Sequence, residues 1–209
     1  MAGRFITFEG GEGGGKSTQL KLLAETLRDR GGEVVTTREP GGSPGAEEIR
    51  KLLVSGDTDR WDATTEMLLH SAARRDHLVK TVWPALARGA WVLCDRFADS
   101  TMAYQGYGHG VPRDVIGHLT RLTLGDFTPN LTLVLDLPEE IGLTRAGGRG
   151  GAEDRYERMG DAFHARLRQG FLAIAAAEPD RCAVIDAGGS VETVRAAILA
   201  VVETRLGSP

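Results

Sequence analysis

Cysteine is scarce in this sequence, because Cys94 and Cys182 are the only two among 209 residues. Both stand in apolar runs that are typical of strands, so we expect two free thiols in the core of a protein from a reducing compartment. No run approaches the roughly 18 apolar residues that a membrane-spanning helix needs. The first residues lead into an apolar strand without the layout of a signal peptide. We therefore expect a cytoplasmic protein with no membrane partner.

Positive charge is not in excess either, since 25 lysine and arginine residues stand against 29 acidic residues and give a net charge of −4. Proteins dedicated to nucleic acids usually carry a basic surplus, so no nucleic-acid partner is expected. At 209 residues, 41% of them hydrophobic, the chain is long enough to bury one core of its own. The sequence has no internal repeat, linker or low-complexity segment, so residues 1–209 are predicted to form one domain.

Short apolar runs alternate along the chain with longer stretches of helical period. The strands are expected at residues 4–9, 33–37, 91–95, 131–136 and 182–186. The helices are expected at residues 16–30, 46–53, 64–87, 112–124, 139–146, 156–177 and 191–206. This alternation predicts an α/β fold of three layers, in which a five-stranded parallel sheet is covered by helices on both faces.

One segment does not have the pattern of a core element. Residues 145–155 place four glycines among the three arginines Arg145, Arg149 and Arg155. Because glycine loses much conformational entropy when it is fixed, this segment is expected to be mobile unless a ligand orders it. A solvent-exposed loop is one interpretation. The arginines favour a second one, a lid over about residues 145–157 that closes on phosphate groups.

A phosphate-binding motif follows the first expected strand. The residues after Glu9 match the pattern G-x-x-x-x-G-K-[ST] between a strand and a helix. Glycines let backbone N–H groups point at phosphate oxygens, and the next helix adds the positive end of its dipole. Lys16 can reach the β- and γ-phosphates, and the Ser17 hydroxyl can ligate Mg²⁺. We therefore expect a nucleoside triphosphate on Gly10, Gly11, Glu12, Gly13, Gly14, Gly15, Lys16, Ser17 and Thr18.

Several classes of P-loop protein are not supported. The chain has no N-K-x-D string to read guanine, no L-S-G-G-Q string of transporter ATPases and no second lysine near the start of the P-loop, as partitioning ATPases have. Residues 186–189 imitate the D-x-x-G of GTPases, but they come after the last expected strand and are interpreted as a turn. A small-molecule kinase is the simplest interpretation. A regulatory ATPase that only switches a partner is the binding-protein alternative.

Three polar segments follow expected strands, on the side where an open parallel sheet binds its ligands. Arg38 stands in the turn at 37–43, which fits either a simple polar turn or a phosphate contact. Asp95 and Arg96 fit either a structural ion pair or ligands for magnesium and phosphate. Hydroxyl, phenol and amide groups that could read a sugar and a base come from Ser100, Thr101, Tyr104 and Gln105.

Taken together, these segments resemble the thymidylate kinase family, whose members phosphorylate dTMP with ATP. The shared strings are Phe-Glu-Gly-Gly-Glu-Gly-Gly-Gly-Lys-Ser-Thr at 8–18, Thr-Arg-Glu-Pro-Gly-Gly at 37–42, Ala-Ala-Arg at 72–74, Asp-Arg at 95–96, Ser-Thr at 100–101, Ala-Tyr-Gln-Gly at 103–106, Leu-Gly-Asp-Phe at 124–127, Pro-Asn-Leu at 129–131 and Asp-Arg-Tyr-Glu at 154–157. The resemblance implies a P-loop kinase fold, the substrates dTMP and ATP, Mg²⁺ and a homodimer. Another nucleotide or deoxynucleoside kinase of the same fold is the alternative.

The resemblance also implies how the phosphate groups are held. Glu12 would contact the 3′-hydroxyl of dTMP, while Arg38 and Arg96 would hold its phosphate. Asp95 would serve the magnesium site. Phosphoryl transfer needs positive charge on the moving group and little covalent help, so Lys16 and Arg96 are expected to neutralise charge during the transfer.

For the base and the sugar, the resemblance implies a second set of residues. Arg74 and Thr101 would face the thymine edge, with Gln105 near it, and the ring of Tyr104 would crowd the sugar 2′ position and so favour deoxyribose. The chain departs from the family at His70, where a phenylalanine usually stacks on thymine. An imidazole can also stack, with less area, and an ordinary helix histidine is the alternative.

The family divides by the position of an additional catalytic arginine, which comes either from the P-loop or from the lid. Here Glu12 is followed by glycines, so the P-loop has no arginine, whereas the expected lid contains Arg145 and Arg149. The chain therefore resembles the lid-arginine variant, with Arg149 as the expected donor. A lid can deliver its charge when ATP is bound and can exclude water from the reaction.

Overall fold

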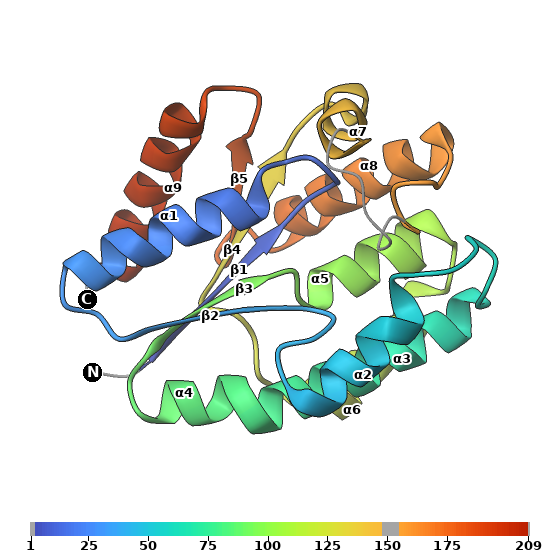
Figure 1. The fold of residues 1–209 in the computed structure, drawn as a ribbon, viewed down its shortest axis with the longest axis horizontal. Helices are drawn as coiled ribbons and strands as arrows, with labels where there is room; N and C mark the ends of the chain where they lie inside the picture. The colour runs from blue at the N-terminus through green and yellow to red at the C-terminus, as the bar shows by residue number, and fades with distance from the viewer. Residues whose placement is uncertain (1–2, 148–154, 209) are drawn as a thin grey trace.

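The computed structural model describes residues 3–147 and 155–208. Its strands form one parallel sheet in the order β2-β3-β1-β4-β5 (Figure 1). They are β1 (Arg4–Glu9), β2 (Val34–Arg38), β3 (Trp91–Asp95), β4 (Leu131–Asp136) and β5 (Cys182–Asp186). Four of these strands begin and end where the sequence predicts, and β2 is shifted by one residue. The predicted five-stranded parallel sheet is therefore confirmed.

Helical segments connect the strands, and two of them, η1 and η2, are π-helical. In the described residues they are α1 (Lys16–Asp29), α2 (Pro44–Leu53), α3 (Ala63–His77), η1 (Leu78–Val82), α4 (Trp83–Ala87), α5 (Ala98–Thr101), η2 (Met102–Gly108), α6 (Arg113–Leu124), α7 (Glu139–Gly147), α8 (Asp161–Ala177) and α9 (Val191–Leu206).

The helices differ from the predictions in three places. The helix expected at 64–87 is divided by η1, since Pro84 cannot donate an N–H and its ring displaces a carbonyl of the preceding turn. Helix α8 begins at Asp161 rather than at 156, because the backbone of its N-cap Gly160 is extended, with a ψ of 160°. Helices α5 and η2 were not predicted, although residues 98–108 carry several of the expected substrate contacts.

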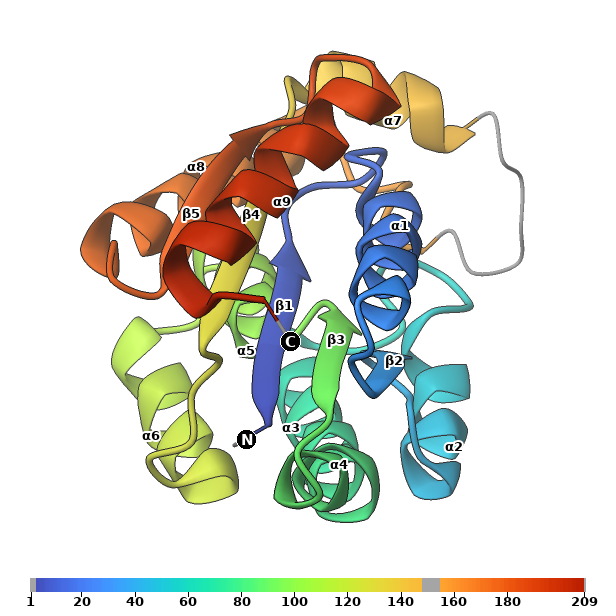
Figure 2. The same ribbon diagram turned by 90° about the vertical axis from the view of Figure 1, so that its left-hand side faces the viewer.

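Helices cover both faces of the sheet (Figures 1 and 2). On one face, Ile6 of β1 packs with Leu23 of α1 and Ile198 of α9. On the other face, Phe5 packs with side chains of η1 and α4, while Val134 of β4 packs with those of α8. The alternation of Phe5 and Ile6 follows from the two-residue period of a strand that is buried on both sides.

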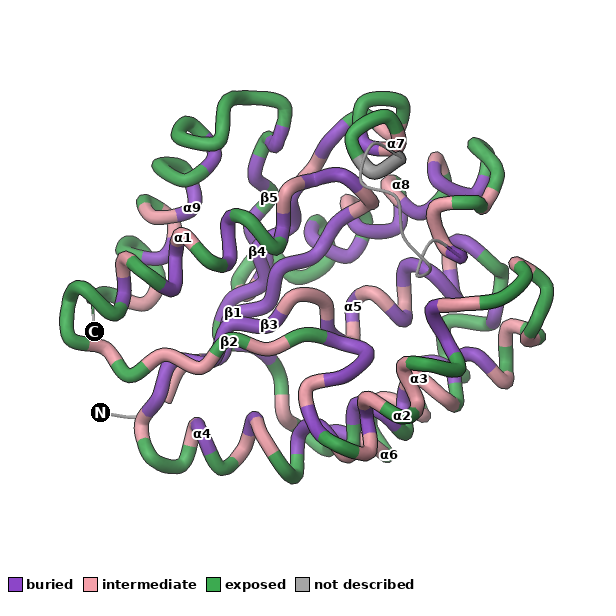
Figure 3. The backbone as a smooth tube through the Cα atoms, viewed as in Figure 1, coloured by how far each residue is buried: buried purple, intermediate pink, exposed green. Residues whose placement is uncertain are grey.

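The middle of the sheet is the most buried part of the chain, as Figure 3 shows for β1, β3 and β4. Cys94 and Cys182 are free and buried, as predicted. Within residues 3–147 and 155–208, no helix is long and apolar enough to cross a membrane. Strands β1 and β3 end in Glu9 and Asp95, so two carboxylates lie at the same edge of the sheet.

Candidate active site

A cavity of about 220 Å³ lies at the edge of the sheet where β1 and β3 end. Its walls come from the P-loop, the turn after β2, the segment after β3, helix α3 and the residues just before α8. The structure brings together around it all of the residues expected to bind the acceptor: Glu12, Arg38, His70, Arg74, Arg96, Ser100, Thr101, Tyr104 and Gln105.

The cavity has further wall residues to which the sequence analysis gave no role. They are Glu39, Pro40, Arg50, Val54, Phe97, Tyr156 and Glu157. Four of these seven stand in the strings at 37–42 and 154–157 that the chain shares with the family, so the sequence did contain a signal for them. The other three carry no local signal, because they reach the cavity only through the packing of α2 against α3 and through the path of the chain from β3 into α5.

The P-loop adopts backbone conformations that glycine reaches at little cost. Gly10, Gly13 and Gly15 have φ angles of 126°, 70° and 81°. Position 13 also lacks room for a side chain, because a Cβ added there would lie 2.0 Å from the carbonyl oxygen of Gly142 in α7. A Cβ added at Gly142 would lie 2.5 Å from the carbonyl oxygen of Glu12. The P-loop and α7 therefore meet backbone to backbone.

Lys16 is the first residue of α1, and its side chain folds back over the loop. Its Nζ donates hydrogen bonds to the carbonyl oxygens of Gly10 at 3.2 Å and Gly11 at 2.7 Å. Burial and the nearby charge of Arg96 lower the pKa of Lys16 to about 8, although Glu12 opposes this effect. An ammonium group held only by carbonyl oxygens can exchange them for phosphate oxygens.

Ser17 and Asp95 bring two oxygen atoms together beside the P-loop. Ser17 Oγ donates a hydrogen bond to Asp95 Oδ2 at 2.5 Å, and both residues line a second cavity of about 130 Å³ with the P-loop. Among the described residues there is no cluster of three or more histidine, cysteine, aspartate or glutamate side chains that could hold a metal by themselves. Mg²⁺ needs only one or two protein oxygens when water and phosphate complete its shell, so this pair fits it.

Arg96 is the centre of a charged cluster between the two cavities. Its φ of 69° is uncommon for a residue other than glycine and is held by the surrounding contacts. The guanidinium donates to the carbonyl oxygen of Gly10 at 3.0 Å and to Glu12 Oε1 at 2.9 Å, and it lies 5.1 Å from the ring centroid of Tyr104. The Tyr104 hydroxyl also donates to Glu12 Oε1.

This cluster keeps its carboxylate ionised. Burial disfavours the charged form of Glu12, but the charges of Arg96 and Lys16 outweigh burial and lower its pKa to about 2. The side chains of Arg96 and Glu12 keep 17% and 18% of their surface exposed, so a ligand can reach both. The cavity thus presents a fixed anion beside a fixed cation.

Glu9 lies behind Arg96, is fully buried and was not assigned by the sequence analysis. Its carboxylate accepts hydrogen bonds from the N–H of Phe97 at 2.7 Å and from the Oγ of Ser100 at 2.6 Å. Arg96 Nη1 in turn lies 3.3 Å from the same Oγ. Burial and the charge of Asp99 raise the pKa of Glu9 to about 7. Glu9 therefore fixes the segment after β3 that carries Arg96.

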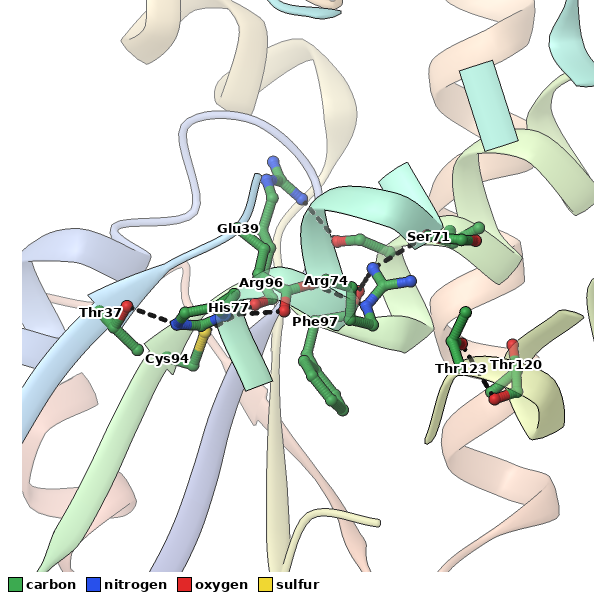
Figure 4. A network of polar contacts seen from close by, with 12 residues as sticks. Thr37, Glu39, Ser71, Arg74, His77, Cys94, Arg96, Phe97, Thr120 and Thr123 are labelled. Atoms are coloured by element: carbon green, nitrogen blue, oxygen red, sulfur yellow. Dashed lines mark hydrogen bonds and ion pairs between the residues drawn. The ribbon is translucent and has the colours of Figure 1, made fainter. Parts of the chain in front are cut away.

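A buried polar network holds Arg74 of α3 (Figure 4). Its Nε donates to Glu39 Oε2 at 2.7 Å, and its Nη2 donates to Thr101 Oγ1 and to the Phe97 carbonyl oxygen, both at 3.0 Å. The other oxygen of Glu39 lies 3.0 Å from His77 Nδ1. No hydrogen bond within the described residues uses Arg74 Nη1, so this end of the guanidinium is left for a ligand in the cavity that Arg74 lines.

Gln105 and Arg38 lie at opposite extremes of exposure. Gln105 is 1% exposed, and neither its amide oxygen nor its amide nitrogen has a hydrogen-bond partner among the described residues. Because an unsatisfied buried amide is costly, a ligand with a donor and an acceptor is the expected partner. The Arg38 side chain is 51% exposed and pairs with Glu47 Oε2 at 3.0 Å. Arg38 therefore lies at the open side of the cavity.

His70 lines the cavity and contacts Tyr156, which belongs to the expected lid at about residues 145–157. Its Nε2 lies 2.9 Å from the Tyr156 hydroxyl, which donates to Glu66 Oε1. Arg155 is fully buried and also donates to Glu66, as well as to the Asp57 carbonyl oxygen at 2.9 Å. Arg155 therefore anchors the chain to α3, and its guanidinium is already occupied.

The remainder of the expected lid is only partly described. Residues 148–154, including Arg149, lie outside the described residues. Arg145 in α7 is exposed, and its Nη1 donates to the Ala187 carbonyl oxygen at 3.2 Å. Residues 186–189, interpreted as a turn, contain a hydrogen bond from the Gly188 N–H to Asp186 Oδ1 at 2.8 Å.

Together the two adjoining cavities define a class of protein. One is bordered by a P-loop with its lysine and serine, and the other by arginines, a carboxylate and an unpartnered amide. This arrangement on a five-stranded parallel sheet is that of a P-loop phosphotransferase acting on a nucleotide.

Comparisons with known proteins give the family. The thymidylate kinase family model matches residues 8–198, so the chain belongs to the thymidylate kinase family. Thymidylate kinase of Caulobacter vibrioides is 60% identical over 98% of both chains, and that of Gluconobacter oxydans is 55% identical over 99% of this chain and 98% of the relative. The crystal structure of thymidylate kinase from Ehrlichia chaffeensis is 37% identical and superposes with a TM-score of 0.78, covering 97% of this chain and 99% of that one.

Proposed function

We propose that this protein transfers the γ-phosphoryl group of ATP to the 5′-phosphate of dTMP, giving dTDP and ADP in the synthesis of dTTP. The observation that carries the proposal is the cavity in which Glu12, Arg96, Tyr104 and Gln105 lie together beside the P-loop. An ionised carboxylate suits a sugar hydroxyl, a guanidinium suits a phosphate and an unpartnered amide suits a base edge. Family membership supports thymine as the base.

In this reaction the protein mainly positions its substrates, because the acceptor phosphate is already anionic and needs no strong general base. Lys16 would exchange its carbonyl partners for phosphate oxygens of ATP, which the backbone N–H groups of the P-loop also bind. Arg96 would hold the acceptor phosphate between the two cavities, and Arg38 would bind it from the open side. Glu12 would accept a hydrogen bond from the 3′-hydroxyl. The Tyr104 ring, whose hydroxyl donates to Glu12, would crowd the 2′ position.

The thymine ring would lie between α3 and η2. Arg74, held by Glu39, would offer Nη1 to a carbonyl oxygen of the base, and Gln105 would satisfy its amide on the same edge. Thr101 shares the Arg74 guanidinium and would help to fix this edge. His70 would form one wall beside the ring.

Mg²⁺ would be held by Ser17 and Asp95. When bound, the ion supplies positive charge that offsets the negative charge of the phosphates. The protein contributes two adjacent oxygens, fixed by the start of α1 and by the end of β3.

Arg149 is the proposed donor of the additional positive charge. The P-loop has no basic residue other than Lys16, and Arg155 is occupied by Glu66. Arg149→Ala should lower kcat roughly 10²-fold or more, by analogy with other transferred arginines. Single-turnover rates with saturating ATP would measure this effect. A near-normal rate would assign the role to Arg145.

We further propose a homodimer in the cytoplasm, with residues 1–209 as one domain. Helices α3 and α6 pack against each other and expose Leu68, Val115 and Leu122 at 50%, 44% and 80%. Apolar side chains gathered on neighbouring helices suit a second copy of the chain. Leu122→Glu should shift the mass measured by light scattering from dimer to monomer, and an unchanged mass would place the interface elsewhere.

Coupled assays with each nucleoside monophosphate test the acceptor. We expect dTMP to be the best substrate with ATP, and equal or better turnover of dUMP, dGMP or AMP would replace the assignment by another nucleotide kinase of this fold. A regulatory ATPase would bind ATP and form no phosphorylated nucleotide with any of them.

A further inference from the structure

Hydrogen bonds link His70 to Tyr156 and Tyr156 to the buried carboxylate of Glu66. Glu66 is 1% exposed and forms an ion pair with the fully buried Arg155. The same carboxylate oxygen accepts a hydrogen bond from the Tyr156 hydroxyl, whose oxygen lies 2.9 Å from His70 Nε2. Glu66 and His70 come from α3, whereas Tyr156 comes from the segment before α8.

Which atom carries the proton in each of these two hydrogen bonds follows from which groups can donate. An ionised carboxylate paired with arginine can only accept, so the single proton of Tyr156 is directed to Glu66. The Tyr156 oxygen must then accept from His70, which places a proton on His70 Nε2. In a neutral imidazole the other ring nitrogen, Nδ1, is then left without a proton.

The surroundings of His70 also decide its charge. The charged and titratable groups that face it are Arg50 of α2, Glu66 and Arg74 of α3, Arg96 after β3, and Arg155 and Tyr156 before α8. Burial, followed by the charges of Arg74 and Arg155, lowers the pKa of His70 to about 3. Glu66 is linked to His70 through the Tyr156 hydroxyl, and Arg155 offsets its charge.

The neighbouring rings hold the same arrangement in place. The Tyr156 ring packs edge-on against Tyr104, with centroids 5.2 Å apart, and lies 6.2 Å from the His70 ring. All three residues line the acceptor cavity. The orientation of the His70 ring is therefore linked to a carboxylate that does not itself line the cavity.

We propose that Glu66 and Tyr156 are positioning residues that hold His70 as the uncharged Nε2–H tautomer in the wall of the acceptor cavity. The wall then presents an imidazole of constant charge and orientation to the base of the acceptor. The proposal rests on the proposed function only for the identity of that acceptor.

The first test reads the tautomer directly in the enzyme without substrates. Nitrogen-15 spectra of the histidine rings, with His70 assigned by its loss in His70→Phe, should show a proton on Nε2 and none on Nδ1. This pattern should stay unchanged between about pH 5 and pH 8, the range in which an ordinary histidine changes its charge. A proton on Nδ1, or titration of His70 inside this range, would overturn the proposal.

Tyr156→Phe removes one oxygen atom and keeps the ring, so it breaks both hydrogen bonds with little change in packing. His70 then loses its fixed acceptor, so the nitrogen-15 spectra should show its proton shared between Nε2 and Nδ1, while the ring stays uncharged because its burial and the nearby arginines are unchanged. The KM for dTMP should rise roughly 3- to 10-fold, as expected for one lost hydrogen bond, while the KM for ATP stays within about twofold. The matched control is Tyr107→Phe, because the Tyr107 hydroxyl accepts from Arg113 and the residue does not line this cavity.

A double variant separates positioning from simple packing. The ratio of acceptor KM between Tyr156→Phe and the parent chain cancels the titration of the substrate phosphate and should be roughly 3 to 10 at each pH. The same ratio measured in the His70→Phe background should be flat with pH and close to one. Equal ratios in both backgrounds would show that Tyr156 acts only by packing. If dTMP is not the acceptor, the nitrogen-15 spectra still report the tautomer of His70. The KM ratios are then measured with the monophosphate that the enzyme does phosphorylate.

Discussion

Two arginine–glutamate pairs in this molecule, one partly exposed and one fully buried, have the same chemistry and different consequences. Arg96 and Glu12 retain 17% and 18% of their side-chain surface in the cavity, whereas Arg155 and Glu66 retain 0% and 1%. The first pair can exchange its partners for groups of a substrate. The second pair has carbonyl oxygens and the Tyr156 hydroxyl around it, so it holds elements together. Exposure to the cavity, and not the pairing itself, distinguishes a binding pair from a structural one.

The largest effect on activity is expected at the exposed pair. Arg96→Met should lower kcat/KM for dTMP by roughly 10³-fold or more, because the acceptor phosphate loses its charged partner. Its free energy of unfolding should change less than that of the Arg155 variant described next. The control is Arg88→Met, which breaks the exposed pair with Glu33. Activity within tenfold of the parent would remove Arg96 from the phosphate site.

The largest effect on stability is expected at the closed pair. Arg155→Met leaves Glu66 buried without its cation and should cost about 3–5 kcal/mol of unfolding free energy in urea. Lys51→Met, which breaks a pair whose side chains are 68% and 71% exposed, should cost less than about 1 kcal/mol. An Arg155 variant as stable as the Lys51 variant would contradict the contrast between the two pairs.

A smaller effect on binding is expected at the carboxylate of the exposed pair. Glu12→Gln keeps the size and removes the charge, so the KM for dTMP should rise about 10-fold while the KM for ATP changes little. Steady-state kinetics with each substrate varied in turn would measure this split. The pKa of Glu12 is about 2, so the carboxylate stays ionised in the parent enzyme near neutral pH. A larger rise for ATP than for dTMP would assign Glu12 to the donor.

A smaller effect on stability than that of Arg155→Met is expected at Glu9, a buried acid for which the described residues provide no ion pair. Its pKa is raised from 4.5 to about 7 in the fold, so the folded chain keeps a proton that the unfolded chain loses between these values. Its contribution is therefore fully present below about pH 4.5 and is lost as the pH rises through about 7. Relative to Glu9→Gln, the parent should lose about 1–3 kcal/mol between pH 5 and pH 8 in urea unfolding. A constant difference would contradict the raised pKa.

Much of the fold and of the site was predictable from local patterns. The strands follow short apolar runs, and the P-loop follows from the glycines that let backbone N–H groups point at phosphate oxygens. The division of the helix at 64–87 and the helices at 98–108 were not predicted, because they depend on a proline and on packing around the cavity. Arg38, Arg74 and Gln105 could be named because they stand in segments that follow strands or in shared strings.

The supporting residues could not be predicted, because their partners are distant in the sequence. Glu9 contacts a residue 91 positions away, and Arg155 contacts Glu66 at a separation of 89. In the sequence, Arg155 looks like one more arginine of a glycine-rich segment. Only the fold shows that its charge is already used by Glu66, which is why composition alone overstated the number of arginines available to phosphate.

The contact between Gly13 and Gly142 limits how such a site can change. A side chain at position 13 would need both a left-handed backbone and the volume that the Gly142 carbonyl group occupies. An arginine at position 13 therefore cannot be introduced by one substitution without displacing α7. Placing the additional positive charge at position 13 would require coordinated changes in two segments that are more than 100 residues apart, because the backbone of α7 occupies the volume that the side chain needs.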